Sequence, residues 1–173
     1  MSKLVTYESI DNKSQVFNQI NINSKQELDN YIGIYKKEQS KFGLIFSGCP
    51  DAKYKLYNSA QRKWLNMELA NLGSSYENFI FKEIDNAKAW QNNLLKNFFE
   101  AFGQPAYDIS VLSFLQHYGA PTPLLDWTYN FENALFFATD GLSYADSDNS
   151  IENYCSVYII DTPDSHKYRN LSP

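Results

Sequence analysis

Hydrophobic residues along this chain recur with two different spacings, and the shorter spacing predicts strands. Residues 43–46 and 154–160 are short, nearly continuous apolar runs bounded by turn-forming residues, which is typical of buried strands. Residues 15–22 alternate between polar and apolar positions, which is typical of a strand with one buried face. The pattern therefore predicts two strands before residue 50 and one near the C-terminus.

A spacing of three and four residues predicts helices between these strands. Side chains that can accept hydrogen bonds from a free helix end precede the apolar stripes and are predicted N-caps. They are Ser24 (with Glu27), Ser59, Ser74 (with Glu77), Asp108, and either Thr128 or Asn130. The longest helix, about 74–102, is expected to be the spine of the core. Its predicted buried stripe comprises Tyr76, Ile80, Ile84, Ala87, Leu94, Phe98 and Phe102.

The order of these elements predicts an α+β fold in a single domain spanning residues 1–173. A small mixed β-sheet is expected, with about five helices packed around it. Few strands occur in so long a chain, so the sheet is expected to be incomplete. Two explanations are open: either the chain is truncated at the C-terminus, with further strands beyond Pro173, or it is a short variant.

Composition narrows the class of protein. Aromatic residues make up 16% of the 173 residues and supply a core. The mean hydropathy is −0.48, and the chain has no apolar run near 18 residues and no apolar N-terminal region. A membrane-spanning helix and a secretory signal are therefore not expected, and the predicted location is the cytoplasm.

Charge and cysteine content exclude further classes. The net charge is −5 and only two arginines occur, so binding to nucleic acid or to an anionic membrane is disfavoured. Acidic residues gather towards the C-terminal end. No Cys/His metal spacing is present, and neither a metal nor a cofactor is expected. Cys49 and Cys155 are interpreted as free buried thiols, with a nucleophilic Cys49 as the alternative.

The stretch 115–139 carries the candidate chemistry. His117 ends a predicted helix, a loop with two prolines follows, and Asp126 precedes a second helix. We expect His117 and Asp126 to meet in a site that also includes Arg62, and we expect Asp126 to be largely buried. Gln116, Thr128, Ser47 and Gly48 are the expected ligand-binding residues of this site.

His117, Asp126 and Arg62 each have a purely structural interpretation as well. His117 suits the end of its own helix, where a cation interacts favourably with the helix dipole. Asp126 suits an Asx-turn to the amide of Thr128 or a cap of the following helix. Arg62 suits a salt bridge with Glu68 or Glu77.

Several segments together resemble the signature of the bacterial FRG-domain family. They are Phe46-Ser47-Gly48, Ser59-Ala60-Gln61-Arg62, Gln116-His117-Tyr118-Gly119, Pro121-Thr122, Leu124-Leu125-Asp126-Trp127-Thr128 and Ala134-Leu135-Phe136-Phe137-Ala138. The resemblance covers residues from about 43 to 160, and the family includes proteins associated with phage defence. It implies a fold and a site, without a known activity.

Two positions depart from the family pattern. Ser47 stands where the family has the arginine of its Phe-Arg-Gly triplet, and Pro123 stands where it usually has the arginine of Pro-Thr-Arg. Arginine offers a permanent charge and a planar fork for carboxylate or phosphate, which serine and proline lack. If the family arginines hold an anionic ligand, this chain is a divergent or inactive member.

Three functions remain open from the sequence. The favoured one is a sensor or binding module in an intracellular defence or regulatory system, with another protein or a small anionic ligand as partner. The alternative is an enzyme or enzyme relic acting on a phosphorylated or nucleotide-type ligand, ADP-ribosyltransferase-like by analogy between short patterns. The third is a scaffold without a ligand.

Overall fold

The computed structural model describes residues 4–38, 43–142 and 150–161. These residues pack as two compact units. Unit 1 is built by Leu4 and Leu56–Leu125, and unit 2 by Val5–Lys55 together with the described residues from Asp126 onward. The single domain expected from the sequence stays a prediction. The acidic residues Asp146, Asp148 and Asp164 lie outside the described residues.

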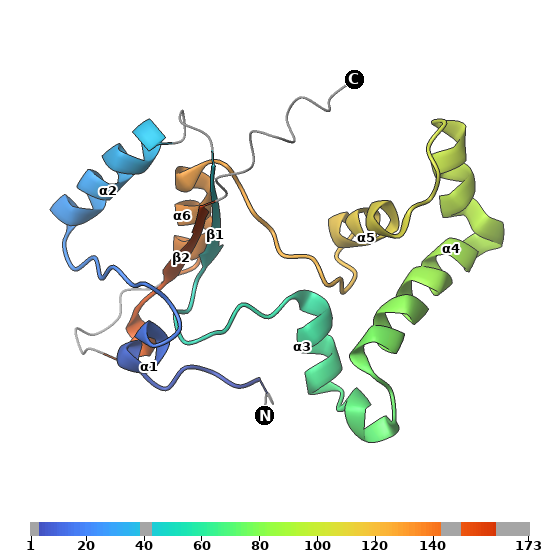
Figure 1. Cartoon of the computed structure of the whole chain (residues 1–173), viewed down its shortest axis with the longest axis horizontal. Coiled ribbons are helices and arrows are strands. Elements are labelled where there is room, and N and C mark those ends of the chain that lie inside the picture. Colours follow the sequence, from blue (N-terminus) through green and yellow to red (C-terminus); the bar gives the residue numbers. More distant parts are fainter. Residues whose placement is uncertain (1–3, 39–42, 143–149, 162–173) are drawn as a thin grey trace. The chain divides into compact units, whose positions relative to one another are not determined.

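Unit 2 holds the strands (Figure 1). Its elements are α1 (Ile10–Ser14), α2 (Lys25–Glu38), β1 (Leu44–Cys49), α6 (Phe131–Thr139), the 3-10 helix η3 (Ile151–Asn153) and β2 (Ser156–Asp161). Helix α1 was not expected from the sequence. Among the described residues, β1 and β2 form an antiparallel two-stranded sheet, so the predicted mixed sheet is wrong, whereas the predicted α+β class with dominant helices is confirmed.

The pairing of β1 with β2 fixes which side chains share a face of the sheet. Phe46 lies opposite Ile159, and Ser47 lies opposite Tyr158. Because successive side chains of a strand point to opposite faces, Phe46 and Ser47 point away from each other. A short bridge joins β1 to residue 128: the Phe46 and Thr128 amides each donate to the other's carbonyl, at 2.8 and 2.9 Å.

Helix α6 packs along β1 on the face that carries Phe46 (Figure 1). A Cβ atom added at Gly48 would clash with the carbonyl oxygen of Ala134 and would lie 2.7 Å from the amide nitrogen of Ala138. Only glycine therefore permits this approach of helix and strand. Phe46, fully buried, then packs against Phe131, with ring centroids 5.4 Å apart.

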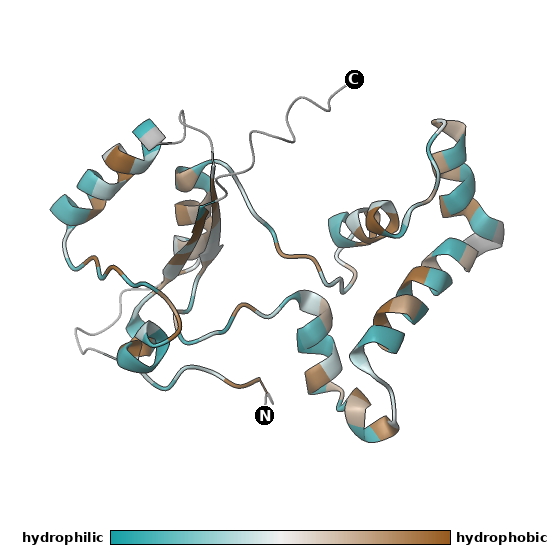
Figure 2. Ribbon diagram, viewed as in Figure 1, coloured by the Kyte–Doolittle hydropathy of each residue, from teal (hydrophilic) through white to brown (hydrophobic). Residues whose placement is uncertain are grey.

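Unit 1 is helical. Its elements are α3 (Ser59–Asn66), the 3-10 helix η2 (Leu69–Leu72), α4 (Tyr76–Ala101) and α5 (Asp108–His117). Its core lies between α4 and α5 and contains Ile84, Leu95, Val111 and Leu112. Figure 2 shows hydrophobic residues distributed along α4 among hydrophilic ones. No helix within the described ranges is long and apolar enough to cross a membrane.

The predicted stripe of α4 is correct only in its first half. Ile84 is buried as expected, but Phe98 is 47% exposed, and the buried position in this turn is Leu95. Asn93 has a φ of +64°, in the left-handed region that asparagine tolerates better than most residues. This distortion coincides with a shift of the buried face by one residue, which a regular period of 3.6 residues cannot anticipate.

The predicted strand at residues 15–22 is also wrong. The chain turns there after α1, with the amides of Val16 and Phe17 donating to the carbonyl of Lys13. Val16 and Ile20 are exposed by 63% and 56%, so the alternation does not mark a buried face.

Helix starts are shifted in three of the predicted places. Asn58, Ser75 and Tyr107 are the N-caps of α3, α4 and α5, each one residue before or after the predicted cap. Asn130 caps α6, which was one of the two residues expected there. The Ser24 hydroxyl accepts from the amide of Glu27, as expected.

The contact at Gly48 gives a test of the fold. Gly48→Ala should lower the free energy of unfolding by about 3 kcal/mol, because the new methyl group clashes with backbone atoms of α6. These atoms can move only if the helix as a whole shifts. Gly33→Ala is the matched control, since nothing lies within 4 Å of the added atom on α2. It should stabilise by about 0.5–1 kcal/mol. Urea denaturation measures both, and equal stability of the two variants would contradict the close packing.

Candidate functional site

The residues of the predicted site are divided between the two units. Unit 1 holds Arg62, Gln116 and His117, and unit 2 holds Ser47, Gly48, Asp126 and Thr128. Each group is therefore described within its own unit. The expected convergence of His117, Asp126 and Arg62 stays a prediction.

In unit 1, three family-like segments meet at Thr122, and we call Ser59, Ala60, Gln116 and Thr122 the Thr122 cluster. Thr122 is fully buried, and its hydroxyl donates to the side-chain oxygen of Gln116. Its amide donates to the Ser59 hydroxyl at 2.9 Å. Its carbonyl accepts from that hydroxyl and from the amide of Ala60, at 3.2 and 3.1 Å. The cluster thus joins the start of α3 to the loop after α5.

Asn58 extends this network on the same side of α3. Its side-chain oxygen accepts from the Gln61 amide at 2.8 Å and from the Tyr76 hydroxyl at 2.9 Å. Its side-chain nitrogen donates to the carbonyl of Pro123 at 3.2 Å. Burial raises the pKa of Tyr76, and the hydrogen bond to Asn58 partly opposes that rise. These hydrogen bonds hold the start of α3 against the loop after α5 and against the first residue of α4.

Arg62 and His117 are exposed in unit 1. The guanidinium of Arg62 donates to the carbonyl of Tyr57 at 2.6 Å, which is a backbone contact and not the predicted salt bridge with Glu68 or Glu77. His117 lies in the last turn of α5, and its ring meets that of Tyr118 edge-on at 5.2 Å. Its position at the helix end agrees with the structural interpretation.

In unit 2, Asp126 is exposed, so the expectation that it is largely buried is wrong. The amide of Thr128 donates to Phe46, and the cap of α6 is Asn130, whose side chain accepts from two amides of the first turn. The hydroxyl of Thr128 accepts from the Asn130 amide at 3.0 Å. The apolar neighbours of Asp126 therefore do not enclose it.

The other face of the sheet, opposite to α6, carries a buried lysine that the sequence did not reveal. Lys13 of α1 is only 6% exposed, and its Nζ donates to the Ala52 carbonyl at 2.9 Å and to the Ser156 hydroxyl at 2.7 Å. The same atom lies 4.7 Å from the ring centroid of Tyr158 and 5.8 Å from that of Tyr7. We call these five residues the Lys13 cluster.

Burial sets the electrostatics of this cluster. Desolvation lowers the pKa of Lys13, and the nearby Cys49, Asp51 and Cys155 partly oppose that shift. Burial also raises the pKa of Tyr158. No sequence signal identifies Lys13, because it lies in a five-residue helix whose other residues are mostly polar.

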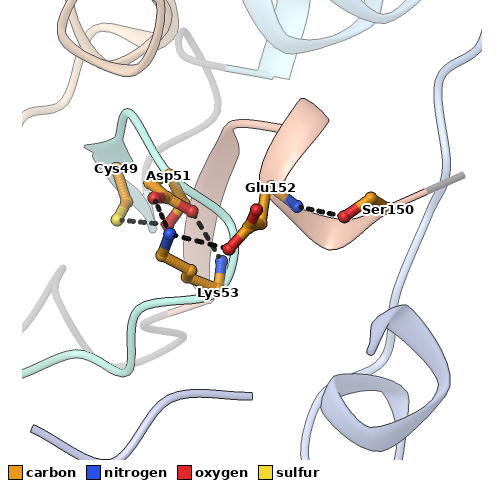
Figure 3. Close-up of polar contacts among 5 residues, drawn as sticks. All are labelled: Cys49, Asp51, Lys53, Ser150 and Glu152. Carbon is orange, nitrogen blue, oxygen red and sulfur yellow. Dashed lines mark hydrogen bonds and ion pairs between the residues drawn. The ribbon is translucent and has the colours of Figure 1, made fainter. Parts of the chain in front are cut away.

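Ion pairs of Lys53 link the loop after β1 to η3 (Figure 3). Lys53 Nζ lies 3.2 Å from an oxygen of Asp51 and 3.1 Å from an oxygen of Glu152, and these partners raise its pKa, Glu152 most. The Cys49 thiol donates to the Asp51 carbonyl at 3.3 Å.

Both cysteines are free, as expected, but they are half-buried and not buried. Burial raises the pKa of Cys155, which disfavours the reactive thiolate at this position. Within the described ranges, no three His, Cys, Asp or Glu side chains gather in a way that could hold a metal ion.

Comparison with known families identifies the family of this chain. The model of the FRG domain matches residues 43–147, which is more than half of the chain, and the chain belongs to this family. The matched range includes β1, the Thr122 cluster and α6. No curated protein and no solved structure matches the chain.

The Thr122 cluster generates a prediction about stability. Thr122→Val keeps the shape of the side chain but removes the hydroxyl that bonds Gln116, and it should destabilise by about 1–3 kcal/mol. Thr139→Val is the control, because that exposed hydroxyl bonds only carbonyls of its own helix. It should change stability by less than about 0.5 kcal/mol. Denaturant titration measures the stability of both variants. An unchanged midpoint for Thr122→Val would contradict a stabilising role of the Thr122 cluster.

Proposed function

We propose that this FRG domain is a binding module that contacts another protein, in an intracellular defence or regulatory system. The observation that carries this proposal is a row of aromatic rings in unit 1, most of them exposed, which we call the α4–α5 aromatic surface. It consists of Phe98, Phe102, Phe114 and Tyr118. The ring centroids of Phe98 lie 5.1 Å from Phe102 and 6.1 Å from Phe114, and those of Phe114 and Tyr118 lie 4.6 Å apart, so the row is continuous from α4 to α5.

Most of this row is exposed to solvent. Phe98, Phe102 and Tyr118 are exposed by 47%, 70% and 71%. Single exposed apolar residues are common, but contiguous ones mark interaction sites, and aromatic residues are enriched in protein interfaces. Tyr107 and Ile109, at the start of α5, are exposed by 61% and 58% and add apolar area on the same helix. The chemistry favours a partner that presents apolar side chains.

The polar residues of the signature support the same proposal. Thr122 is fully buried and bonded to Gln116 and Ser59, and the two lost family arginines, at Ser47 and Pro123, remove the groups best suited to an anionic ligand. An enzyme would need Arg62, His117 and Asp126 to converge on one reacting group. Such a centre remains the alternative to a binding module.

The binding test uses two triple variants in cells. Phe98, Phe102 and Tyr118 are changed to Ser, and the control changes Phe136, Phe137 and Leu142 of unit 2, which are exposed by 60%, 61% and 51%. A partner cross-linked to the natural chain is identified, purified and titrated. We expect the variant of Phe98, Phe102 and Tyr118 to bind this partner at least about tenfold more weakly, because it loses aromatic contacts at the centre of the interface. The control variant should bind as the natural chain does.

The enzyme alternative is tested on the purified chain. NAD, nucleotides and sugar phosphates are added in a calorimeter, and product formation is followed by chromatography. We expect neither tight binding nor turnover. Turnover that disappears in His117→Ala would contradict the proposal and establish the alternative. Partner binding that is equally weakened by both triple variants would also contradict the proposal.

A further inference from the structure

The outer edge of strand β2 carries no further strand in the described part of the chain. The sheet consists of β1 at one edge and β2 at the other (Figure 1). The outer side of β1 is bridged by Thr128. Within the described ranges, only residues of β1 pair with β2. The bridge at β1 determines which backbone groups β2 presents at its outer edge.

The bridge fixes the direction of the backbone groups of β2. Both the amide and the carbonyl of Phe46 bond Thr128, so they point away from β2. Phe46 and Ile159 are therefore a non-hydrogen-bonded pair, and the amide and carbonyl of Ile159 point away from β1. Such pairs alternate along an antiparallel ladder, so Val157 and Asp161 present their groups in the same outward direction. The outer edge of β2 thus offers the amides and carbonyls of three residues to a further strand.

The sequence of β2 has none of the features that protect an open edge. Natural sheets shield such an edge with proline, lysine or a bulge. The strand contains neither proline nor lysine, its register with β1 is continuous, and only Asp161 is charged. Ile159 and Ile160 are exposed by 38% and 42%, one on each face of the sheet. Free backbone groups beside exposed apolar side chains are typical of a strand that pairs with another chain.

From this geometry we propose that β2 pairs with β2 of a second copy of the chain, antiparallel to it, about a twofold axis at Ile159. In this register, Ile159 lies opposite the partner's Ile159, and Val157 lies opposite the partner's Asp161. Every outward-pointing amide and carbonyl of both strands then has a hydrogen-bonding partner. Moving the axis to Tyr158 or to Ile160 would leave one outward-pointing residue without an opposite residue in the strand. The two sheets join into one continuous antiparallel sheet.

The side chains of β2 fit a second copy in the same register. On one face of the sheet, the two Ile159 side chains meet. On the other face, Ile160 lies opposite the partner's Tyr158, and such pairs of β-branched and aromatic side chains stabilise sheets. Asp161 faces the partner's Val157, so the two carboxylates do not oppose each other. The inference is independent of the proposed protein partner, whose contact is the α4–α5 aromatic surface of unit 1.

Hydrogen exchange tests the pairing in the natural chain. Exchange of single amides is followed by NMR at chain concentrations from about 30 μM to about 1 mM, because an interface of one strand edge is small and weak. The amides of Val157, Ile159 and Asp161 should exchange more slowly as the concentration rises. The amides of Tyr158 and Ile160, which point to β1, should be protected at every concentration. Outward amides that are protected at every concentration, or at none, would overturn the proposal.

Two charged variants test the register. Sedimentation equilibrium of the natural chain should show a mass that rises from 20.0 kDa towards twice that value. Ile159→Lys and Ile159→Glu each place like charges opposite each other across the axis, and each should weaken self-association at least about fivefold. An equimolar mixture of the two should associate more tightly than either variant alone, because Lys then faces Glu. Val16→Lys is the matched control, since Val16 is exposed outside the strand, and it should associate as the natural chain does.

Three results of sedimentation would overturn the proposal. One is undiminished association of Ile159→Lys, and another is a mixture that associates no more tightly than its components. The third is association that is lost in the triple variant of Phe98, Phe102 and Tyr118 and kept in Ile159→Lys, which would assign the contact to unit 1. Melting curves show whether the variants fold. If Ile159→Lys does not fold, the exchange of the outward amides in the natural chain decides.

Discussion

The close contact between Gly48 and α6 is the constraint on which the rest of unit 2 depends. The helix backbone approaches the strand so closely that no side chain fits at this position. With Gly48 fixed against Ala134 and Ala138, the strand has only one orientation. Phe46 then enters the core between the sheet and α6, and residue 47 turns to the other face. The three residues of the triplet therefore have three different tasks, set by the alternation of a single strand.

Several polar residues of the signature also hold segments of the chain together by hydrogen bonds. Thr128 pairs with Phe46 through both of its backbone groups, and Asn130 then starts α6 two residues later. In unit 1, Thr122 is bonded on all sides by Ser59, Ala60 and Gln116. A threonine in such a place satisfies buried donors and acceptors that would otherwise cost about 1–3 kcal/mol each. Much of the signature thus specifies packing.

The sequence predicted elements whose signals are local and missed those set by tertiary contacts. Helices α2 to α6 were found, unlike the short α1, because capping residues and apolar stripes act within a few positions, and the starts of α3, α4 and α5 are each wrong by one residue. The strand predicted at 15–22 is wrong, and Val16 and Ile20, which were expected on its buried face, are exposed. The buried face of α4 shifted where Asn93 leaves the regular helical conformation. Asp126 is exposed despite apolar neighbours in sequence, because those neighbours do not surround it.

Lys13 shows why the candidate site was the least predictable part. A lysine in a polar segment is expected on the surface, and only the approach of α1 to the sheet buries it against Tyr158 and Ser156. An ammonium group is compact and donates in three directions, so it satisfies a carbonyl and a hydroxyl from different segments while the rings cover it.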